Sequence, residues 1–231
     1  ILGMYIIVSL VGAADTIIIG GEQRAEANCL EDGEFQVFVP LTAKEVELIE
    51  GQGVALEPMF YLDFLQEDES TLRIYKNREE INLLELDEGQ MPQMAEEVAL
   101  EKRYCEENGI TVGTEIVIAD RSYQVVGIGS VPDYDAPLKN MSDSSVDSKS
   151  FGVAFMTSEA YEDLKASGES VKSEEYIYAY RLNGILSDAE LKEQLQDLEL
   201  SIEDVDDVYF KEYWEENFGA KEDLEEGVEE L

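Results

Sequence analysis

The residue types that could carry out catalysis are unevenly represented in this chain of 231 residues. It has no histidine and only two cysteines, Cys29 and Cys105, but 54 aspartates and glutamates. The lack of histidine excludes Ser-His-Asp and Cys-His catalysis and histidine-containing zinc sites. The cysteines form no Cys-x-x-Cys motif, which excludes a zinc ribbon or a thioredoxin-type redox site. We therefore expect no catalytic residues, no metal site and no cofactor, and we predict that the protein is not an enzyme.

Carboxylates are the one abundant class of reactive group. With so many of them, no particular pair indicates glycoside hydrolysis, and the single tryptophan, Trp214, argues against an aromatic-lined sugar cleft. Loose binding of calcium by acidic loops, for example through Asp133, Asp135 and Asp143, stays open as an alternative, because oxygen ligands suit that ion.

Two motifs match known ligand-binding loops only in part. The tripeptide Gly127-Ile-Gly129 follows a predicted strand as a dinucleotide-binding loop would, but Pro132 occupies the third glycine position. Residues 204–207 (DVDD) resemble the start of an EF-hand, but Tyr209 occupies the position of its required glycine. We therefore assign no nucleotide or calcium site to either motif.

The charge of the chain limits its partners. Sixteen basic residues oppose the 54 acidic ones, for a formal net charge of −38. Nucleic acids and anionic membranes attract proteins through Lys and Arg, so this chain is repelled by both, and we predict no nucleic-acid partner. Two interpretations of the acidity stay open. It keeps the surface soluble, or it forms a face for cations or cationic peptides.

The beginning of the chain is apolar and uncharged. Because the chain starts with Ile1 and not Met, we interpret it as a piece of a longer protein. Residues 1–14 are too few to cross a bilayer, which takes about 20 residues. They are either the outer half of a transmembrane helix or a buried core segment; the charged residues Asp15, Glu22 and Arg24, which follow closely, favour the first.

The two cysteines lie far apart in the sequence, in segments that we predict to be helical. A disulfide between Cys29 and Cys105 would suit an extracytoplasmic protein. The sequence does not show that the two residues meet, and we expect free thiols.

Hydrophobic periodicity and turn residues predict alternating strands and helices. Thr42 with Glu45, and Ser187 with Glu190, have the spacing of helix capping boxes. We expect strands at 35–39, 54–65, 71–75, 82–86, 114–118, 123–128, 151–156, 176–182 and 207–211. We expect helices at 15–30, 43–49, 93–107, 159–166 and 188–198, and an exposed loop at 130–150.

The strand at 176–182 places Tyr176, Tyr178 and Tyr180 on one face. This row is either a contact surface for a peptide or a sugar, or the face of a sheet that lies under a helix.

These elements indicate an α+β fold with two lobes. We predict a discontinuous main α/β lobe from residues 15–80 and 151–211, and a smaller α/β lobe inserted at 81–150. Residues 212–231 are strongly acidic, with an apolar seam at Leu224, Val228 and Leu231. They form either an amphipathic helix packed on the domain or an acidic helical stalk; we predict the stalk.

Several runs resemble one known family in their order. They are Leu86 to Pro92 (LDEGQMP), Glu97 to Leu100 (EVAL), Asn108 to Gly113 (NGITVG), Tyr123 to Ile128 (YQVVGI) and Pro132 to Tyr134 (PDY). This order resembles the extracytoplasmic core domain of ABC-transporter permeases of the FtsX/MacB type. The motifs are glycines and apolar positions, which dictate turns and packing and not chemistry.

The resemblance implies a location and a mechanism. The domain would lie on the extracytoplasmic side of a cell membrane, between the first two transmembrane helices of a permease. Its partners would be a separate ATP-binding cassette subunit, a second permease copy in a homodimer, and an unknown substrate or extracellular protein. It would transmit ATP-driven motion to the outer face and dock the substrate or partner. The chain has no phosphate-binding P-loop, so ATP would bind elsewhere. The alternative is a membrane-anchored extracellular binding or adhesion module.

Overall fold

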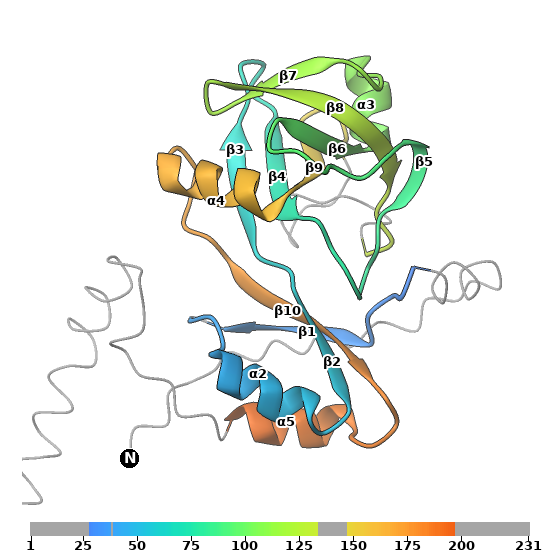
Figure 1. Cartoon of the computed structure of the whole chain (residues 1–231), viewed down its shortest axis with the longest axis vertical. Coiled ribbons are helices and arrows are strands. Elements are labelled where there is room, and N and C mark those ends of the chain that lie inside the picture. The colour runs from blue at the N-terminus through green and yellow to red at the C-terminus, as the bar shows by residue number, and fades with distance from the viewer. Residues whose placement is uncertain (1–27, 38, 134–146, 197–231) are drawn as a thin grey trace, which may run out of the picture.

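The computed structural model describes residues 28–37, 39–133 and 147–196, whose strands form two separate sheets (Figure 1). The α+β fold class is confirmed. The apolar segment 1–14, most of the loop 130–150 and the predicted stalk 212–231 lie outside the described residues. Within these ranges, no helix combines the length and the apolar character that a membrane crossing needs.

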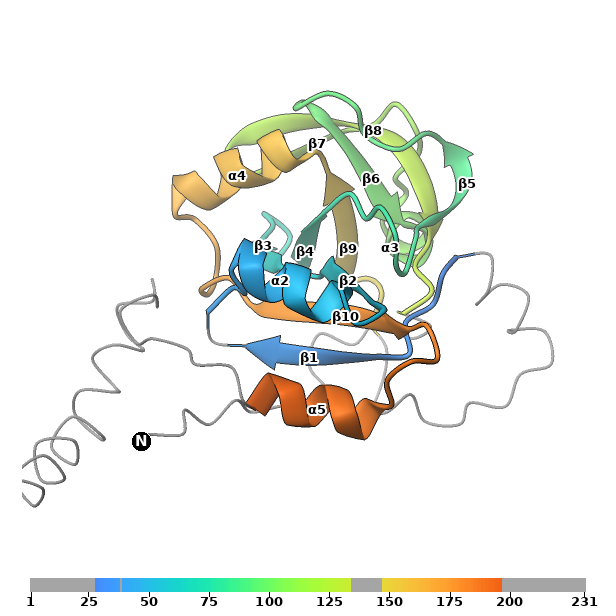
Figure 2. The same ribbon diagram turned by 60° about the horizontal axis from the view of Figure 1, so that its bottom comes forward.

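The smaller sheet has three antiparallel strands in the order β1 (Gly33–Val37), β10 (Tyr176–Leu182) and β2 (Val54–Pro58). Helices α2 (Ala43–Glu50) and α5 (Asp188–Gln196) lie beside it (Figure 2). Both helices contribute to the core on one face of this sheet, which includes Phe35, Ile49, Leu56, Tyr178, Tyr180, Leu191 and Leu195. We call the sheet and its two helices the smaller unit.

The larger sheet is mixed and curled (Figure 1). Strand β9 runs parallel to β4 and antiparallel to β6, and β6 runs parallel to β8. Its seven strands are β3 (Tyr61–Leu65), β4 (Thr71–Lys76), β5 (Glu85–Gly89), β6 (Glu97–Glu101), β7 (Glu115–Ile118), β8 (Arg121–Ser130) and β9 (Phe151–Met156).

Helices α3 (Lys102–Asn108) and α4 (Ser158–Ser167) pack against the larger sheet. We call this sheet and its two helices the larger unit. Its apolar core includes Phe64, Ile74, Leu100, Tyr104, Val125, Met156, Tyr161 and Leu164. Every residue of β9 is buried, as expected for a central strand that is covered on both faces.

Side-chain caps fix the helix starts. The Glu45 amide donates to the Thr42 hydroxyl, and the Thr42 amide donates to the Glu45 carboxylate, at 3.3 and 2.7 Å. Ser187 and Glu190 make the same reciprocal pair before α5. Both predicted capping boxes are confirmed. Each occupies amide groups that the first turn of a helix leaves unpaired.

The strands predicted at 114–118 and 123–128 correspond to β7 and β8, which pair as an antiparallel hairpin. Its two-residue turn consists of Ala119 and Asp120, whose φ angles are +50° and +57°. Two consecutive positive φ values are typical of a type I′ turn, whose twist matches that of the flanking strands.

The predicted helix at 93–107 is wrong in its first half. Residues Glu97–Glu101 form strand β6, and only Lys102–Asn108 are helical. In β6 the side chains of Val98, Ala99 and Leu100 are all fully buried between neighbouring strands. Partners on both sides pair with these backbone groups, and this tertiary pairing outweighs the local preference for helix. The predicted helix end at 28–30 is likewise not helical.

The predicted single strand at 54–65 is two strands in different sheets. Strand β2 pairs with β10 in the smaller sheet, and β3 pairs with β4 in the larger one. The change of sheet follows Pro58, which has no amide to donate to a ladder. Similarly, the strand predicted at 82–86 is displaced to Glu85–Gly89, so that the predicted turn at 87–90 lies largely within β5.

The two sheets divide the chain differently from the predicted lobes. Strands β4 and β9 belong to the predicted main lobe, and β6 and β8 belong to the predicted insertion. All four strands lie in the larger sheet. The smaller sheet instead combines β1 and β2 with the late strand β10. The two sheets meet at an apolar contact that includes Met59, Tyr61, Tyr75, Ile81, Phe151, Phe155 and Ala179.

Candidate functional site

The tyrosine row of β10 belongs to the hydrophobic core. Tyr178 is 3% exposed and Tyr180 is fully buried, and both pack under the helices of the smaller unit. The Tyr178 hydroxyl accepts a hydrogen bond from the Leu41 amide at 3.0 Å, and the Tyr180 hydroxyl donates to Asp188 at 2.8 Å. The interpretation as a sheet face under a helix is therefore confirmed, and Tyr178 and Tyr180 are not free to bind a ligand.

The glycines of the Gly127-Ile-Gly129 tripeptide serve strand packing. Both lie in β8, opposite β5. A Cβ atom at Gly127 would lie 2.3 Å from the Gln90 carbonyl oxygen, and one at Gly129 would lie 2.4 Å from that of Glu85. Only glycine permits so close an approach of two backbones. The structure thus gives these residues a role in packing.

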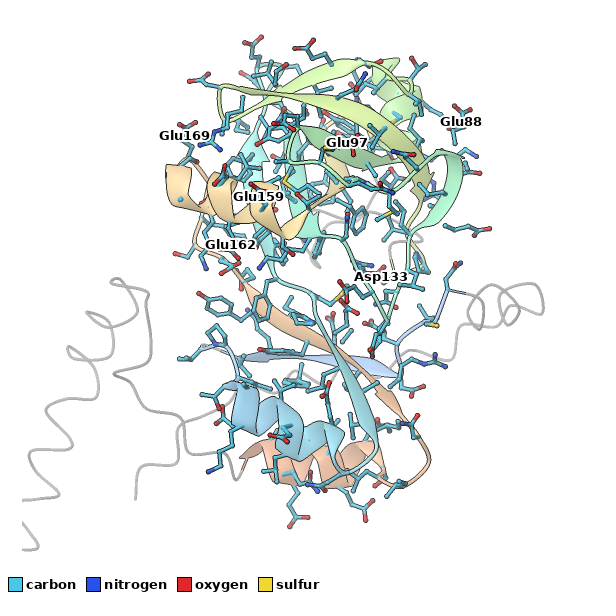
Figure 3. All side chains as sticks on the ribbon, in the orientation of Figure 1. Glu88, Glu97, Asp133, Glu159, Glu162 and Glu169 are labelled. Carbon is cyan, nitrogen blue, oxygen red and sulfur yellow. The ribbon has the colours of Figure 1, made fainter. Side chains whose placement is uncertain are left out.

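A buried arginine binds an aspartate and a backbone carbonyl within the larger unit. The guanidinium of Arg78 donates to both carboxylate oxygens of Asp133, at 2.6 and 3.0 Å, and to the Asn82 carbonyl at 2.8 Å. Its side chain is only 2% exposed and lies over the rings of Tyr75 and Phe155. Figure 3 shows Asp133 at the level where the larger unit meets the smaller one. We call this place the Arg78 junction.

Asp133 was one of three candidate calcium ligands. Both of its oxygens bind Arg78, and Asp135 and Asp143 lie outside the described residues. Among the residues with described positions, no group of three or more Asp, Glu or Cys could hold a metal ion. In the described part of the chain, the counter-charge of Asp133 is therefore the Arg78 guanidinium.

Glu57 crosses from the smaller sheet to the larger unit. Its carboxylate, on β2, accepts hydrogen bonds from the successive amides of Glu79, Glu80 and Ile81, the closest at 2.7 Å. Burial is the main effect on this group and raises its pKa, while the three amides and nearby Arg78 lower it. The side chain holds the loop after β4 against the smaller sheet.

The segment before β1 is bonded to the segment before β5. The amides of Asn82 and Leu83 donate to the carbonyls of Cys29 and Asn28, at 3.1 and 2.9 Å. The fully buried Asn82 side chain accepts from the Glu31 amide and donates to the Glu31 carboxyl, at 3.0 and 2.7 Å. We call this contact between residues 28–32 and 82–85 the clasp.

Carboxylates outnumber the positive charge at the Arg78 junction. Burial raises the pKa of Glu31 to about 7, and the charges of Asp133 and Glu34 add to this effect, against the opposing effects of Asn82 and Arg78. The pKa of Glu34 is raised too, chiefly by burial and then by Asp133. One guanidinium thus faces several carboxylates in a poorly hydrated place, which disfavours the simultaneous ionisation of Glu31, Glu34 and Glu57.

A second buried ion pair lies in the larger sheet. Asp63 and Arg73 are directly opposite each other on β3 and β4, and two parallel bonds of 2.9 and 3.0 Å join them. The Arg73 guanidinium also lies 3.9 Å from the centre of the Tyr61 ring. Both Arg73 and Arg78 escaped prediction from the sequence. The sequence offered one signal for these two residues. Basic residues are rare in this chain, so a basic residue within or just after a central strand needs a buried acidic partner.

Two shallow hollows lie on the outer side of β8. They have volumes of about 490 and 290 Å³ and share Gly113 and Gln124. Glu96, Glu97 and Glu115 line them. The Glu97 carboxylate accepts from the amides of residues 93 and 94, and Glu115 accepts from the Ser122 hydroxyl. Glu97 and Glu115 are thus engaged within the protein.

The cysteines are free, as expected. Cys105 is buried on α3, and burial raises the pKa of its thiol to about 12. A thiol in this environment stays protonated at neutral pH and is a poor nucleophile.

No family profile matches this chain, and no curated protein does. Three solved structures are similar to it in part. The periplasmic region of MacB from Actinobacillus actinomycetemcomitans is 12% identical, with 68% of this chain and 72% of that chain covered and a TM-score of 0.38. The extracellular domain of the noncanonic ABC-type transporter YknZ from Gram-positive bacteria is 12% identical, with 67% and 78% covered and a TM-score of 0.40.

The third is a domain of a putative permease protein from Porphyromonas gingivalis. It is 17% identical, with 73% of this chain and 81% of that chain covered and a TM-score of 0.40. These three structures include the kind of domain that the sequence motifs resemble. At such identities and TM-scores, however, the likeness does not by itself assign a function to this chain.

Proposed function

We propose that this chain is the extracytoplasmic domain of an ABC-transporter permease of the FtsX/MacB type. In this role it transmits ATP-driven motion from the membrane to the outer face, where it docks a substrate or a partner protein, and it catalyses no reaction. The ordered motifs of residues 86–134 support this proposal, since they are distributed along the larger unit as glycine turns and buried strand positions.

The hydrogen bonds of residues 28–32, which we call the incoming segment, are the main support for this proposal. Residues 28–32 follow the charged stretch after the apolar segment 1–14 and continue directly into β1 of the smaller sheet. Through the clasp they are also bonded to the larger unit. A displacement of this segment would therefore act on both units at once. The last described helix, α5, lies in the same unit as β1, an arrangement that suits a domain whose two connections leave from one side (Figure 1).

The partners follow from this role. ATP would bind to a separate ATP-binding cassette subunit, reached through membrane helices, and the permease would act as a homodimer. No group on the described surface indicates which substrate is transported. The net charge of −38 favours a partner surface that is neutral or basic over one that is acidic.

A labelling experiment on the full-length gene product tests the location. Glu169, which follows α4, is exposed, so a Glu169→Cys substitution in a Cys29→Ser background provides an accessible thiol (Figure 3). We expect a membrane-impermeant maleimide to label this thiol in intact cells. Labelling only after permeabilisation would overturn the extracytoplasmic location.

A second measurement tests the transmission of motion. Spin labels at Glu169 and at the exposed Lys192 of α5 report the distance between the larger and smaller units. We expect ATP to change this distance when the ATPase subunit that co-purifies is present, and not when that subunit carries a variant unable to bind ATP. If the full-length protein instead has a single anchor helix and no ATPase co-purifies with it, the chain is part of a membrane-anchored binding or adhesion module.

A further inference from the structure

The clasp depends on a small number of polar bonds. Two backbone bonds join residues 28 and 29 to residues 82 and 83, and the two bonds between Glu31 and Asn82 complete it. A weaker contact of 3.4 Å leads from the Asn28 amide to the Glu85 carboxylate. No side chain of residues 28–32 belongs to a described apolar core cluster. The clasp is therefore sensitive to the charge of the few groups within it.

Acidic groups face Glu31 from every neighbouring element. Glu34 on β1 and Asp133 after β8 repel its ionised form, whereas the hydrogen bond from the Asn82 side chain and the charge of Arg78 favour it. Tyr180 on β10 and Asp32 lie within electrostatic range on the side of the smaller sheet. The positive charge of Arg78 also acts on Glu57. Arg78 already forms two bonds with Asp133, so it cannot compensate the remaining carboxylates fully.

We propose that the clasp is a proton-dependent latch between the incoming segment and the larger unit. A proton on the Glu31 carboxyl holds residues 28–32 against Asn82 and Leu83, and loss of this proton releases them. The latch would set how firmly the incoming segment is attached to the larger unit at a given external pH. It is a property of the domain alone and does not require the proposed function.

The direction of the effect follows from the titration of Glu31. Its pKa is raised from 4.5 to about 7 when the clasp is closed, chiefly by burial. A raised pKa contributes stability to the closed form below pH 4.5, and this contribution is lost as the pH rises through 7. If the open segment titrates near the ordinary value, the closing equilibrium weakens about tenfold between pH 6 and pH 8.5.

Hydrogen exchange of the full 231-residue chain measures the latch directly. The amides of Asn82 and Leu83 are the donors of the two backbone bonds. After correction for the intrinsic exchange rate, we expect their protection to fall about tenfold between pH 6 and pH 8.5 in the unmodified chain. Protection that does not change with pH would overturn the latch.

Two variants separate the latch from a general effect of charge. Glu31→Gln mimics the protonated carboxyl, so its clasp should stay closed with no dependence on pH in this range. Glu169→Gln removes an acid on the far side of the larger unit and should behave as the unmodified chain (Figure 3). The proposal is wrong if Glu31→Gln retains the pH dependence of the unmodified chain.

A steric effect of Glu31→Gln would also weaken the clasp, so the titration of the native residue is the second test. The carboxyl carbon of Glu31 can be followed by NMR as a function of pH in the unmodified chain. A midpoint near 7 supports the proposal. A midpoint near 4.5 overturns it, whatever the behaviour of the variant.

Discussion

Replacing Arg78 with methionine tests how much the Arg78 junction stabilises the fold. Methionine retains much of the packing on the rings of Tyr75 and Phe155 but cannot donate to Asp133 or to the Asn82 carbonyl. The Asp133 carboxylate, whose side chain is only 11% exposed, would lose both hydrogen bonds from the guanidinium. The variant therefore leaves an uncompensated charge in a poorly hydrated place.

The size of the effect follows from the burial of the pair. Removing one partner of a buried ion pair reduces the free energy of unfolding by about 3–5 kcal/mol. Arg78→Lys keeps the positive charge but loses the paired geometry, so we expect a loss of about 1–2 kcal/mol. Urea unfolding at pH 7 measures both. For Arg78→Met the loss should shrink as the pH falls towards 5, because burial raises the pKa of Glu31 to about 7 and this carboxyl becomes neutral.

Arg121→Met is the matched control. Arg121 pairs with Asp163 at 3.3 Å, but the two side chains are 47% and 63% exposed. An exposed pair of this kind contributes less than about 1 kcal/mol. If Arg78→Met costs no more than Arg121→Met, or if its cost does not decrease at lower pH, the Arg78 junction does not stabilise the fold as described.

Three further predictions concern single positions. Glu57→Ala should lower the free energy of unfolding by about 1–3 kcal/mol, because three backbone amides lose their acceptor; urea unfolding that is unchanged would contradict this role. Gly152→Ala should lower it by about 1–3 kcal/mol, since the new Cβ would lie 2.4 Å from Cγ of Tyr104, and a melting temperature equal to that of the unmodified chain would refute this clash. Iodoacetamide should modify Cys105 much more slowly in the native protein than after unfolding, because its thiol is buried and has a pKa of about 12; mass spectrometry of the peptides measures this, and equal rates in the two states would refute it.

Local signals in the sequence were sufficient where the interaction itself is local. The Thr42 and Ser187 capping boxes each join residues three positions apart, and the structure contains both. The β7–β8 hairpin is likewise set by a two-residue turn. The lack of histidine and the charge of −38 excluded whole classes of catalytic site and partner without reference to any fold.

Patterns of apolar residues were ambiguous where partners come from distant parts of the chain. The segment 97–101 suits the inner turns of a helix as well as a strand, and it becomes a strand because β8 and β9 pair with it on both sides. The run 54–65 reads as one strand, yet its two halves pair with β10 and β4 in different sheets. Nothing within either segment specifies these partners.

The sequence by itself determined the class of the fold, several element boundaries and the absence of histidine-based chemistry. Only the tertiary structure brought Arg78 to Asp133, 55 residues later in the chain, and Glu31 to Asn82, 51 residues later. Among 54 acidic residues, no spacing marks these as the ones that matter. Their ionisation depends on burial and on the charges around them, and both arise only when the two sheets pack together.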